Sequence, residues 1–154
     1  CFTRRISRSF KDLYAMTTIK EKINYYQESL SIFDDTMEKY KFLLDQGKKA
    51  NPFPEEFRQE TFKVSGCQAQ VWLVPYIKES KIYFHSDSDA FISKGMITIL
   101  CDIYGGRNPN EIVKTKFDLL KTLKLDNLLT PGRRNGVYAM LMKIREHANA
   151  HITT

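Results

Sequence analysis

The first third of the chain carries apolar side chains at the spacing of two amphipathic helices. Thr18, with Glu21 three residues later, forms a capping box and predicts the start of the first helix. A second helix is predicted to begin near Asp34 or Asp35 and to stop at Gly47, because glycine commonly ends helices. The apolar faces are expected at Ile19, Ile23, Tyr26 and Leu30, then at Phe33, Met37, Tyr40 and Leu44.

The middle of the chain changes to alternating apolar and polar positions, which predict strands. Three short strands are expected over residues 61–65, 70–77 and 81–86. Only residues 78–80 separate the last two strands, which favours an antiparallel hairpin. Pro75 indicates an edge or a bulge, because proline has no N–H for the ladder.

Helical patterns return after the strands. The sequence Asp-Ser-Asp at residues 87–89 is predicted to cap a strongly apolar helix, which should be the buried centre and should end at residues 105–106. Shorter helices are expected to open at residues 108–109 and around residues 119–123, and the last helix at residues 130–131. This order predicts an α+β fold, with a small three-stranded antiparallel sheet packed against helices.

Composition fits one globular domain. The chain has 154 residues, of which 42% are hydrophobic and 27% charged. No apolar run approaches the roughly 18 residues of a membrane-spanning helix, so no membrane partner is expected. Residues 1–16 are basic, and we assign them to an N-terminal tail (a transit remnant, upstream sequence or a remnant of recombinant expression). Residues 17–154 form the predicted domain.

The net charge of +6 raises the question of nucleic-acid binding. The basic excess lies in residues 1–16 and 107–154, whereas the residues between them are slightly acidic. No RNA-binding strand motif or zinc-finger pattern accompanies this excess, so no nucleic-acid partner is expected. A basic surface for an acidic protein partner fits the charge equally well.

The three cysteines, Cys1, Cys67 and Cys101, are too few and too scattered for a disulfide framework, and no Cys-x-x-Cys pair or histidine cluster indicates a metal site. Cys67 follows Gly66 at a bend between two extended runs, where a partner can reach a thiol. Cys101 falls inside the apolar helix and is expected to be a packing residue. The alternative for Cys67 is a small buried hydrophobe, which most free cysteines are.

The segment Gly66–Trp72, with the sequence Gly-Cys-Gln-Ala-Gln-Val-Trp, closely resembles the cysteine loop of the SufE family, the sulfur-acceptor proteins of iron–sulfur cluster assembly. The resemblance covers all but about the first fifteen residues. It implies a two-layer SufE/NifU-like α+β fold. Its further motifs are Asp-Ser-Asp-Ala at 87–90, Lys-Gly at 94–95, Tyr-Gly-Gly at 104–106 and Arg-Arg-Asn-Gly-Val-Tyr-Ala-Met at 133–140.

The resemblance implies that Cys67 accepts sulfur from the persulfide of a PLP-dependent cysteine desulfurase of the SufS or CsdA kind. The sulfur would pass to a scaffold of the SufBCD kind. PLP belongs to the partner, so the chain itself would need no cofactor and would be a carrier and desulfurase activator rather than an enzyme. Such a persulfide should rest in a sheltered position and swing out when the donor docks.

The resemblance also assigns expected roles around Cys67. Gly66 would allow the swing, Trp72 would form a floor, and Gln68 and Gln70 would donate hydrogen bonds to the sulfur anion. Arg133 would support the thiolate or the docking of the desulfurase. Asp87 and Asp89 would chiefly be helix caps, with a second role in orienting the loop.

Two features of the last helix need an explanation. Arg133 and Arg134 lie in its first turn, where cations are unfavourable, so the pair suggests another use. Gly136 is a poor helix former, which suggests that something packs close against the backbone there. The sequence departs from many relatives at Ala69 and Gly132, where serine is common.

An iron–sulfur scaffold of the IscU type is the alternative function. Such scaffolds use three cysteines near one another, whereas only Cys67 lies in a suitable loop here. The expected location is the cytoplasm, or an organellar stroma or matrix if residues 1–16 are a transit remnant.

Overall fold

The computed structural model describes residues 18–115 and 118–152. The predicted N-terminal tail and Cys1 lie outside these residues. The described chain folds into helices α3 to α8, two short 3₁₀ helices and one antiparallel hairpin. None of the described helices is both long and apolar enough to cross a membrane.

The first two helices form as their capping residues predict. In α3 (Ile19–Ser31) the Thr18 side chain accepts a hydrogen bond from the Glu21 backbone N–H at 3.1 Å. In α4 (Thr36–Lys48) Asp35 accepts one from the Met37 N–H at 3.1 Å. Each cap satisfies an N–H group that the helix itself leaves without a partner.

The expectation that Gly47 stops α4 is wrong, because the helix continues to Lys48. The structure gives this glycine a different reason. A Cβ on Gly47 would lie 3.0 Å from the backbone nitrogen of Gly95, and a Cβ on Gly95 would lie 2.0 Å from the Leu43 carbonyl oxygen. The two helix backbones therefore touch at a pair of glycines.

The sheet is a hairpin of β1 (Val71–Lys78) and β2 (Lys81–Ser88). Its register runs from Val71 opposite Ser88 to Lys78 opposite Lys81, so the predicted hairpin is confirmed. Glu79 and Ser80 turn the chain with φ angles of 53° and 65°, which is the positive-φ pair that tight two-residue hairpins require.

The predicted third strand over residues 61–65 is wrong, and the described sheet has two strands. Residues Glu60–Phe62 form the 3₁₀ helix η2, which follows η1 at Glu55–Phe57. Only a single bridge from Lys63 to Trp72 remains of the expected pairing. The segment cannot extend further, because Gly66 bends the chain again at a φ of 92°.

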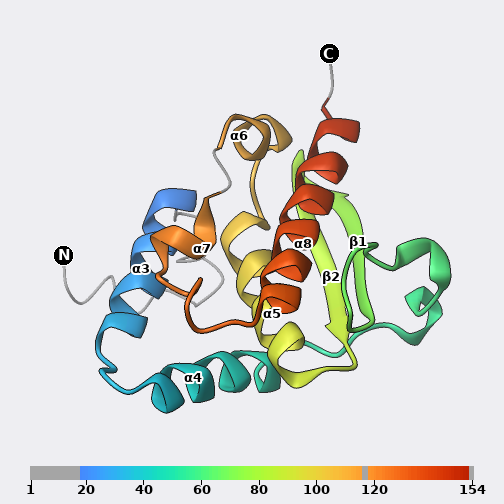
Figure 1. Cartoon of the computed structure of the whole chain (residues 1–154). Helices are drawn as coiled ribbons and strands as arrows, with labels where there is room; N and C mark the ends of the chain where they lie inside the picture. The colour runs from blue at the N-terminus through green and yellow to red at the C-terminus, as the bar shows by residue number, and fades with distance from the viewer. Residues whose placement is uncertain (1–17, 116–117, 153–154) are drawn as a thin grey trace.

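Helix α5 (Phe91–Tyr104) is the centre of the core, as its apolar pattern predicts. Figure 1 shows it between the hairpin and α3 and α4, and it packs on both strands and on α3, α4 and α8 (Pro131–Ala150). Gly105 ends it, as expected. Its fully buried side chains include Met96, Ile97, Ile99, Leu100 and Ile103.

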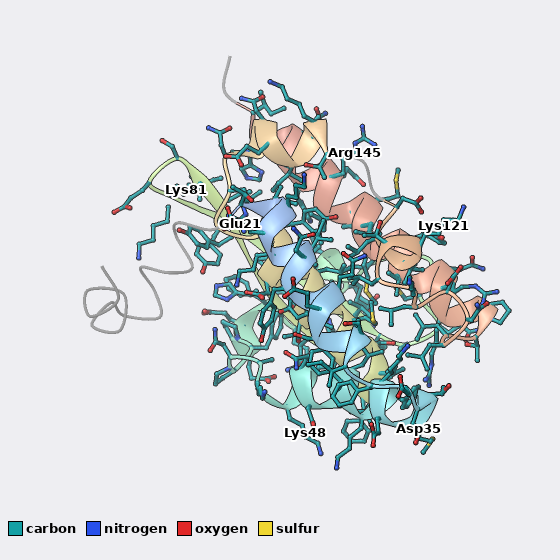
Figure 2. The ribbon with its side chains drawn as sticks, turned by 90° about the vertical axis from the view of Figure 1, so that its left-hand side faces the viewer. Glu21, Asp35, Lys48, Lys81, Lys121 and Arg145 are labelled. Atoms are coloured by element: carbon teal, nitrogen blue, oxygen red, sulfur yellow. The ribbon has the colours of Figure 1, made fainter. Side chains whose placement is uncertain are left out.

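The remaining helices begin where predicted. Asn108 caps α6 (Pro109–Lys114), α7 spans Leu119–Thr122, and Thr130 caps α8. Figure 2 shows α3 lying across the front of α5, with labelled charged side chains such as Lys48 and Lys81 at the rim of the molecule. The core is therefore centred on α5, and the labelled charged side chains lie around its outside.

Candidate functional site

Cys67 lies on a short loop whose first end is fixed at the start of β1. The Val64 N–H donates to the Val71 carbonyl at 2.8 Å, which closes the base of the loop. Gly66 then takes a φ of 92°, which L-residues with a side chain rarely adopt. A Cβ at this position would also lie 3.3 Å from the Cβ of Ala139. The bend next to the cysteine therefore requires glycine.

The Cys67 thiol rests against the first half of α8. Its Sγ donates a hydrogen bond to the Gly136 carbonyl at 3.5 Å, and a Cβ on Gly136 would lie 3.6 Å from this sulfur. The prediction that something packs close to Gly136 is confirmed, and the group that packs there is the thiol itself. Cys67 is half-buried rather than enclosed in the core, and burial raises the pKa of its thiol.

Gln68 extends the loop along the same helix. A Cβ on Gly132 would lie 2.6 Å from Oε1 of Gln68, so the amide occupies the space that a larger residue would fill. Gly132 is one of the two departures from the family pattern. A serine at this position would require the end of the Gln68 side chain to move, so Gly132 and the placement of the Gln68 amide go together.

The second end of the loop is held by Asp89. Its carboxylate accepts hydrogen bonds from the Gln70 backbone N–H at 2.9 Å and from Gln70 Nε2 at 3.0 Å. The Ser88 hydroxyl donates to the Gln70 carbonyl at 2.8 Å. Gln70 is thus fixed by residues that directly precede α5, and its side-chain amide is bound to Asp89 rather than to the sulfur.

The expectation that Asp87 and Asp89 are chiefly helix caps is wrong. The N-cap of α5 is Ala90, which has no polar side chain, so the helix starts without a side-chain cap. Neither carboxylate accepts a hydrogen bond from the first N–H groups of α5. Asp89 accepts one from the Gln70 N–H in the loop instead, and Asp87 accepts one from Arg58 at 2.8 Å. The second role expected of Asp89, orienting the loop, agrees with this geometry.

The described contacts of the Trp72 ring are with Arg58, Lys63 and Phe53, and its expected role as a floor beneath the thiol stays a prediction. Val71 and Leu73 belong to the core, so the side chain between them points to the other face of the sheet. There the guanidinium carbon of Arg58 lies 4.7 Å from the centre of the indole ring, within the range of a cation–π contact. Phe53 lies on the same ring, at a centroid distance of 6.5 Å.

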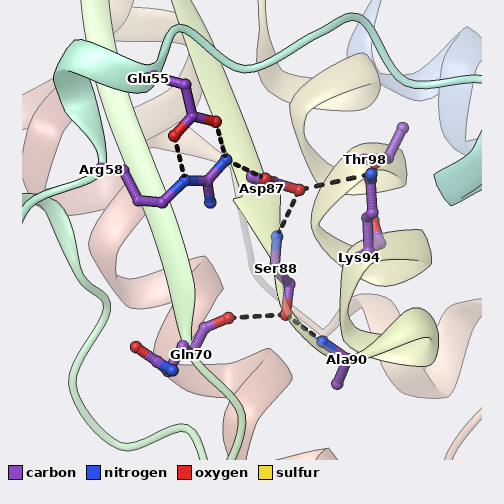
Figure 3. A network of polar contacts seen from close by, with 8 residues as sticks. All are labelled: Glu55, Arg58, Gln70, Asp87, Ser88, Ala90, Lys94 and Thr98. Carbon is purple, nitrogen blue, oxygen red and sulfur yellow. Dashed lines mark hydrogen bonds and ion pairs between the residues drawn. The ribbon is translucent and has the colours of Figure 1, made fainter.

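Arg58 is a residue that sequence reasoning missed. Its guanidinium binds Glu55 through two hydrogen bonds of 2.9 and 2.8 Å and also reaches Asp87, as Figure 3 shows. Asp87 additionally lies 3.5 Å from the ammonium of Lys94. The only sequence signal is the spacing of Glu55 and Arg58, since the contact with Asp87 joins residues far apart in the chain.

The network sets the charge of its central carboxylate. Burial by itself raises the pKa of Asp87, but hydrogen bonds from Arg58 and from the Ser88 N–H outweigh it, so the pKa lies below its ordinary value. The same partnership raises the pKa of Arg58, chiefly through Glu55 and then through Asp87. Both groups are therefore charged throughout the neutral range.

The two arginines of α8 have separate uses, as their unfavourable position suggests. Arg134 donates to the carbonyls of Asp126 and Leu129 at 2.6 and 2.9 Å and so fixes the turn before the helix. Arg133 donates to the hydroxyl of Tyr40 on α4. The hydrogen bonds of Arg133 in the described structure thus include α4 but not the Cys67 thiol, and its expected support of the thiolate stays a prediction.

Cys101 lines a groove of about 960 Å³ that is bounded by α3, the end of α4, residues 49–52, α5 and both strands, and Cys67 does not line it. Burial raises the pKa of its thiol to about 12. Among the described residues, no three His, Cys, Asp or Glu side chains gather into a group that would hold a metal ion.

Comparisons with known proteins identify the family. Residues 24–148 match the family model "SufE: Fe-S metabolism associated domain". The chain is 32% identical over 147 residues to an uncharacterized SufE-like protein of Synechocystis sp., which covers 95% of this chain and 92% of the relative. It is 33% identical over 137 residues to the cysteine desulfuration protein SufE of Wigglesworthia glossinidia brevipalpis, with coverage of 86% and 93%.

Two further similarities extend this comparison. SufE-like protein 1, chloroplastic/mitochondrial, of Arabidopsis thaliana is 31% identical over 144 residues, which cover 91% of this chain and 38% of that longer protein. The solution structure of a hypothetical protein from Thermus thermophilus has the same fold, with a TM-score of 0.72, 18% identity and coverage of 86% and 97%. On the family model and these relatives, the chain belongs to the SufE family, the Fe-S metabolism associated domain.

Proposed function

We propose that this protein carries sulfur on Cys67. The sulfur comes from the persulfide of a PLP-dependent cysteine desulfurase of the SufS or CsdA kind and passes to an iron–sulfur scaffold of the SufBCD kind. Uptake of the sulfur frees the desulfurase for another turnover, so the carrier also activates it. The observation that carries the proposal is a half-buried thiol on a loop held at both ends, in a chain of the SufE family.

The transfer is a displacement at sulfur. The thiolate of Cys67 attacks the outer sulfur of the donor's persulfide, a new S–S bond forms on Cys67, and the S–S bond of the donor breaks. The donor cysteine leaves as a thiolate and accepts the proton that Cys67 has lost. No electrons enter or leave the pair, so the step needs no oxidant or reductant.

The resting geometry supports a sheltered carrier. Burial raises the pKa of Cys67, and its S–H is bound to the Gly136 carbonyl, so the resting thiol is neutral and a weak nucleophile. Rotation about Gly66 would move the sulfur away from α8 into a more polar setting, where the thiolate forms more easily. The same resting position would keep a bound persulfide away from other thiols.

Mass spectrometry of intact protein tests this function. The wild-type chain is incubated with a SufS-type desulfurase and cysteine, and we expect a gain of one sulfur atom that maps to the peptide containing Cys67. Cys67→Ala should show no gain. Cys101→Ala is the control and should gain sulfur normally, because its thiol is buried and lines a groove that Cys67 does not line. Sulfur uptake by Cys67→Ala at the wild-type level would contradict the proposal.

No observation favours the IscU-type scaffold, because the other described cysteine, Cys101, lies inside α5 and lines a groove that does not include Cys67. For the place of action we propose the cytoplasm, or an organellar stroma or matrix if residues 1–16 are a transit segment. The relatives include bacterial proteins and a chloroplastic/mitochondrial one.

A further inference from the structure

Phe91 is the most exposed large apolar side chain in the described part of the chain. It is the first residue of α5, and 79% of its surface is open to solvent. A single exposed apolar residue is common on protein surfaces and needs no explanation by itself. Its meaning depends on what it lies beside.

The backbone of Phe91 is fixed next to the Cys67 loop. Phe91 follows Asp89 by two residues, so their Cα atoms are at most about 7.6 Å apart. Asp89 holds Gln70 at the end of the loop, and the Ala90 N–H donates to the Ser88 hydroxyl at 3.3 Å. An aromatic ring is thus presented to solvent from a rigid position at one border of the loop.

The opposite border of the loop is α8, which also exposes apolar groups. Gly136 and Ala139 face the loop, while Tyr138 and Met142 are 43% and 61% exposed. Residues four apart lie on one face of a helix, so these two side chains form one exposed strip, about 60–100° round α8 from Ala139. Helices α5 and α8 pack against each other, as Figure 1 also shows. The loop therefore lies between two elements that each expose an apolar group.

We propose that Phe91 is an anchor through which this protein docks on its sulfur donor, with Tyr138 and Met142 as the contact on the other border. The proposal rests on the function above, because a donor sulfur can bond to Cys67 only if the donor protein covers the surface around the loop. Aromatic side chains in the centre of an interface commonly supply much of its binding energy.

The side chains on the two borders of the Cys67 loop define what the surface of the sulfur donor must offer. The donor presents an apolar pocket for the ring of Phe91. Helix α8 carries Arg133, Arg134, Lys143 and Arg145 against the single acid Glu146, so carboxylates beside that pocket complement it.

Ile32 provides a matched control. It is 77% exposed, close to the value for Phe91, but it is the C-cap of α3 and lies at the turn into α4. Figure 1 shows this turn on the other side of α5 from the hairpin. Replacing either residue by serine removes a comparable exposed apolar group, and surface changes of this kind rarely alter stability.

The test compares Phe91→Ser with Ile32→Ser, using a SufS-type cysteine desulfurase that loads the wild-type protein. We expect Phe91→Ser to lower the rate of sulfur uptake at limiting protein concentration by about tenfold or more, as loss of an interface anchor does. Saturating concentrations should restore the rate. Ile32→Ser should load as the wild type does, and Tyr138→Ser should show a smaller loss than Phe91→Ser.

Alkylation of Cys67 by iodoacetamide separates docking from loop conformation. This small reagent needs no docking surface, so Phe91→Ser should be alkylated at the wild-type rate. If Phe91→Ser and Ile32→Ser take up sulfur at the same rate, whether reduced or normal, the inference is overturned. An altered alkylation rate in Phe91→Ser would also overturn it. Failure of the wild-type protein to take up sulfur would instead overturn the proposed function.

Discussion

Cys67 and Cys101 are both partly exposed residues, and burial raises the pKa of both thiols, but they belong to different kinds of backbone. Cys67 lies on a loop next to Gly66, and because glycine has no side chain, the backbone there can adopt conformations that other residues rarely reach. Cys101 lies inside α5, where the helix fixes every neighbouring backbone group. Burial raises the pKa of the Cys101 thiol more strongly, which shows that this thiol is the more deeply buried of the two. The backbone around Cys101 is also fixed by the helix, so both differences favour transfer at Cys67 and packing at Cys101.

Alkylation should show the largest difference between the two cysteines. Burial raises the pKa of Cys101 from 9.0 to about 12, which lowers its thiolate fraction near pH 8 by about a thousandfold. We therefore expect iodoacetamide to label Cys67 first, and Cys101 about a thousandfold more slowly than in the unfolded chain. Timed labelling followed by peptide mass spectrometry measures both rates. Labelling of Cys101 as fast as Cys67 would remove the distinction.

Loosening the loop should increase the difference further. Asp89→Asn replaces a charged acceptor of two Gln70 hydrogen bonds, and such bonds stabilise by about 1.5–3 kcal/mol. We expect Cys67 to be alkylated roughly tenfold faster or more, with Cys101 unchanged. Asp35→Asn is the control, because asparagine caps a helix as well as aspartate does. If both variants label like the wild type, Asp89 does not hold the loop.

Two glycines at the thiol should respond with opposite signs. Gly66→Ala places a side chain at a φ of 92° and 3.3 Å from Ala139, so we expect the free energy of unfolding to fall by about 1–2 kcal/mol. Gly136→Ala meets only ordinary contacts, at 3.6 Å from the Cys67 sulfur, and improves helix propensity by up to about 1 kcal/mol. Urea denaturation of both variants measures these changes. A loss of stability in Gly136→Ala would show that the thiol cannot share its space.

Alkaline pH should produce the smallest effect. The folded pKa of Cys101 lies above its unfolded value, so the folded state binds the proton more tightly there. This contribution to stability is complete below about pH 9 and is lost as the pH rises toward 12. We expect wild-type stability to fall relative to Cys101→Ala between pH 8 and 10 in urea titrations. A constant difference would mean that Cys101 ionises as easily when folded.

Local features of this fold could be predicted from the sequence. Thr18, Asp35, Asn108 and Thr130 all cap the helices expected of them, because a cap joins residues two or three positions apart. The hairpin was predictable for the same reason. The third strand was not excluded by its pattern, since short apolar runs also occur where a 3₁₀ turn leads into an extended residue, as at Lys63 here.

Contacts between distant residues could not be predicted. The resemblance implied that Asp89 orients the loop, but nothing in the sequence indicates that it does so by binding Gln70 or that Arg133 reaches Tyr40. The motif around Cys67 located the candidate reactive residue through its resemblance to the SufE family. It did not indicate that Trp72 is buried against Arg58 and Phe53, on the face of the sheet opposite Val71 and Leu73.

The contact between Gly47 and Gly95 limits how this fold can diverge. At both positions the neighbouring backbone fills the space of a Cβ, so even alanine would push α4 away from α5. A relative with a larger residue at either position would have to carry α4 farther out, and with it Tyr40, the partner of Arg133. Drift at two sites remote from the sulfur would then reposition the first turn of α8.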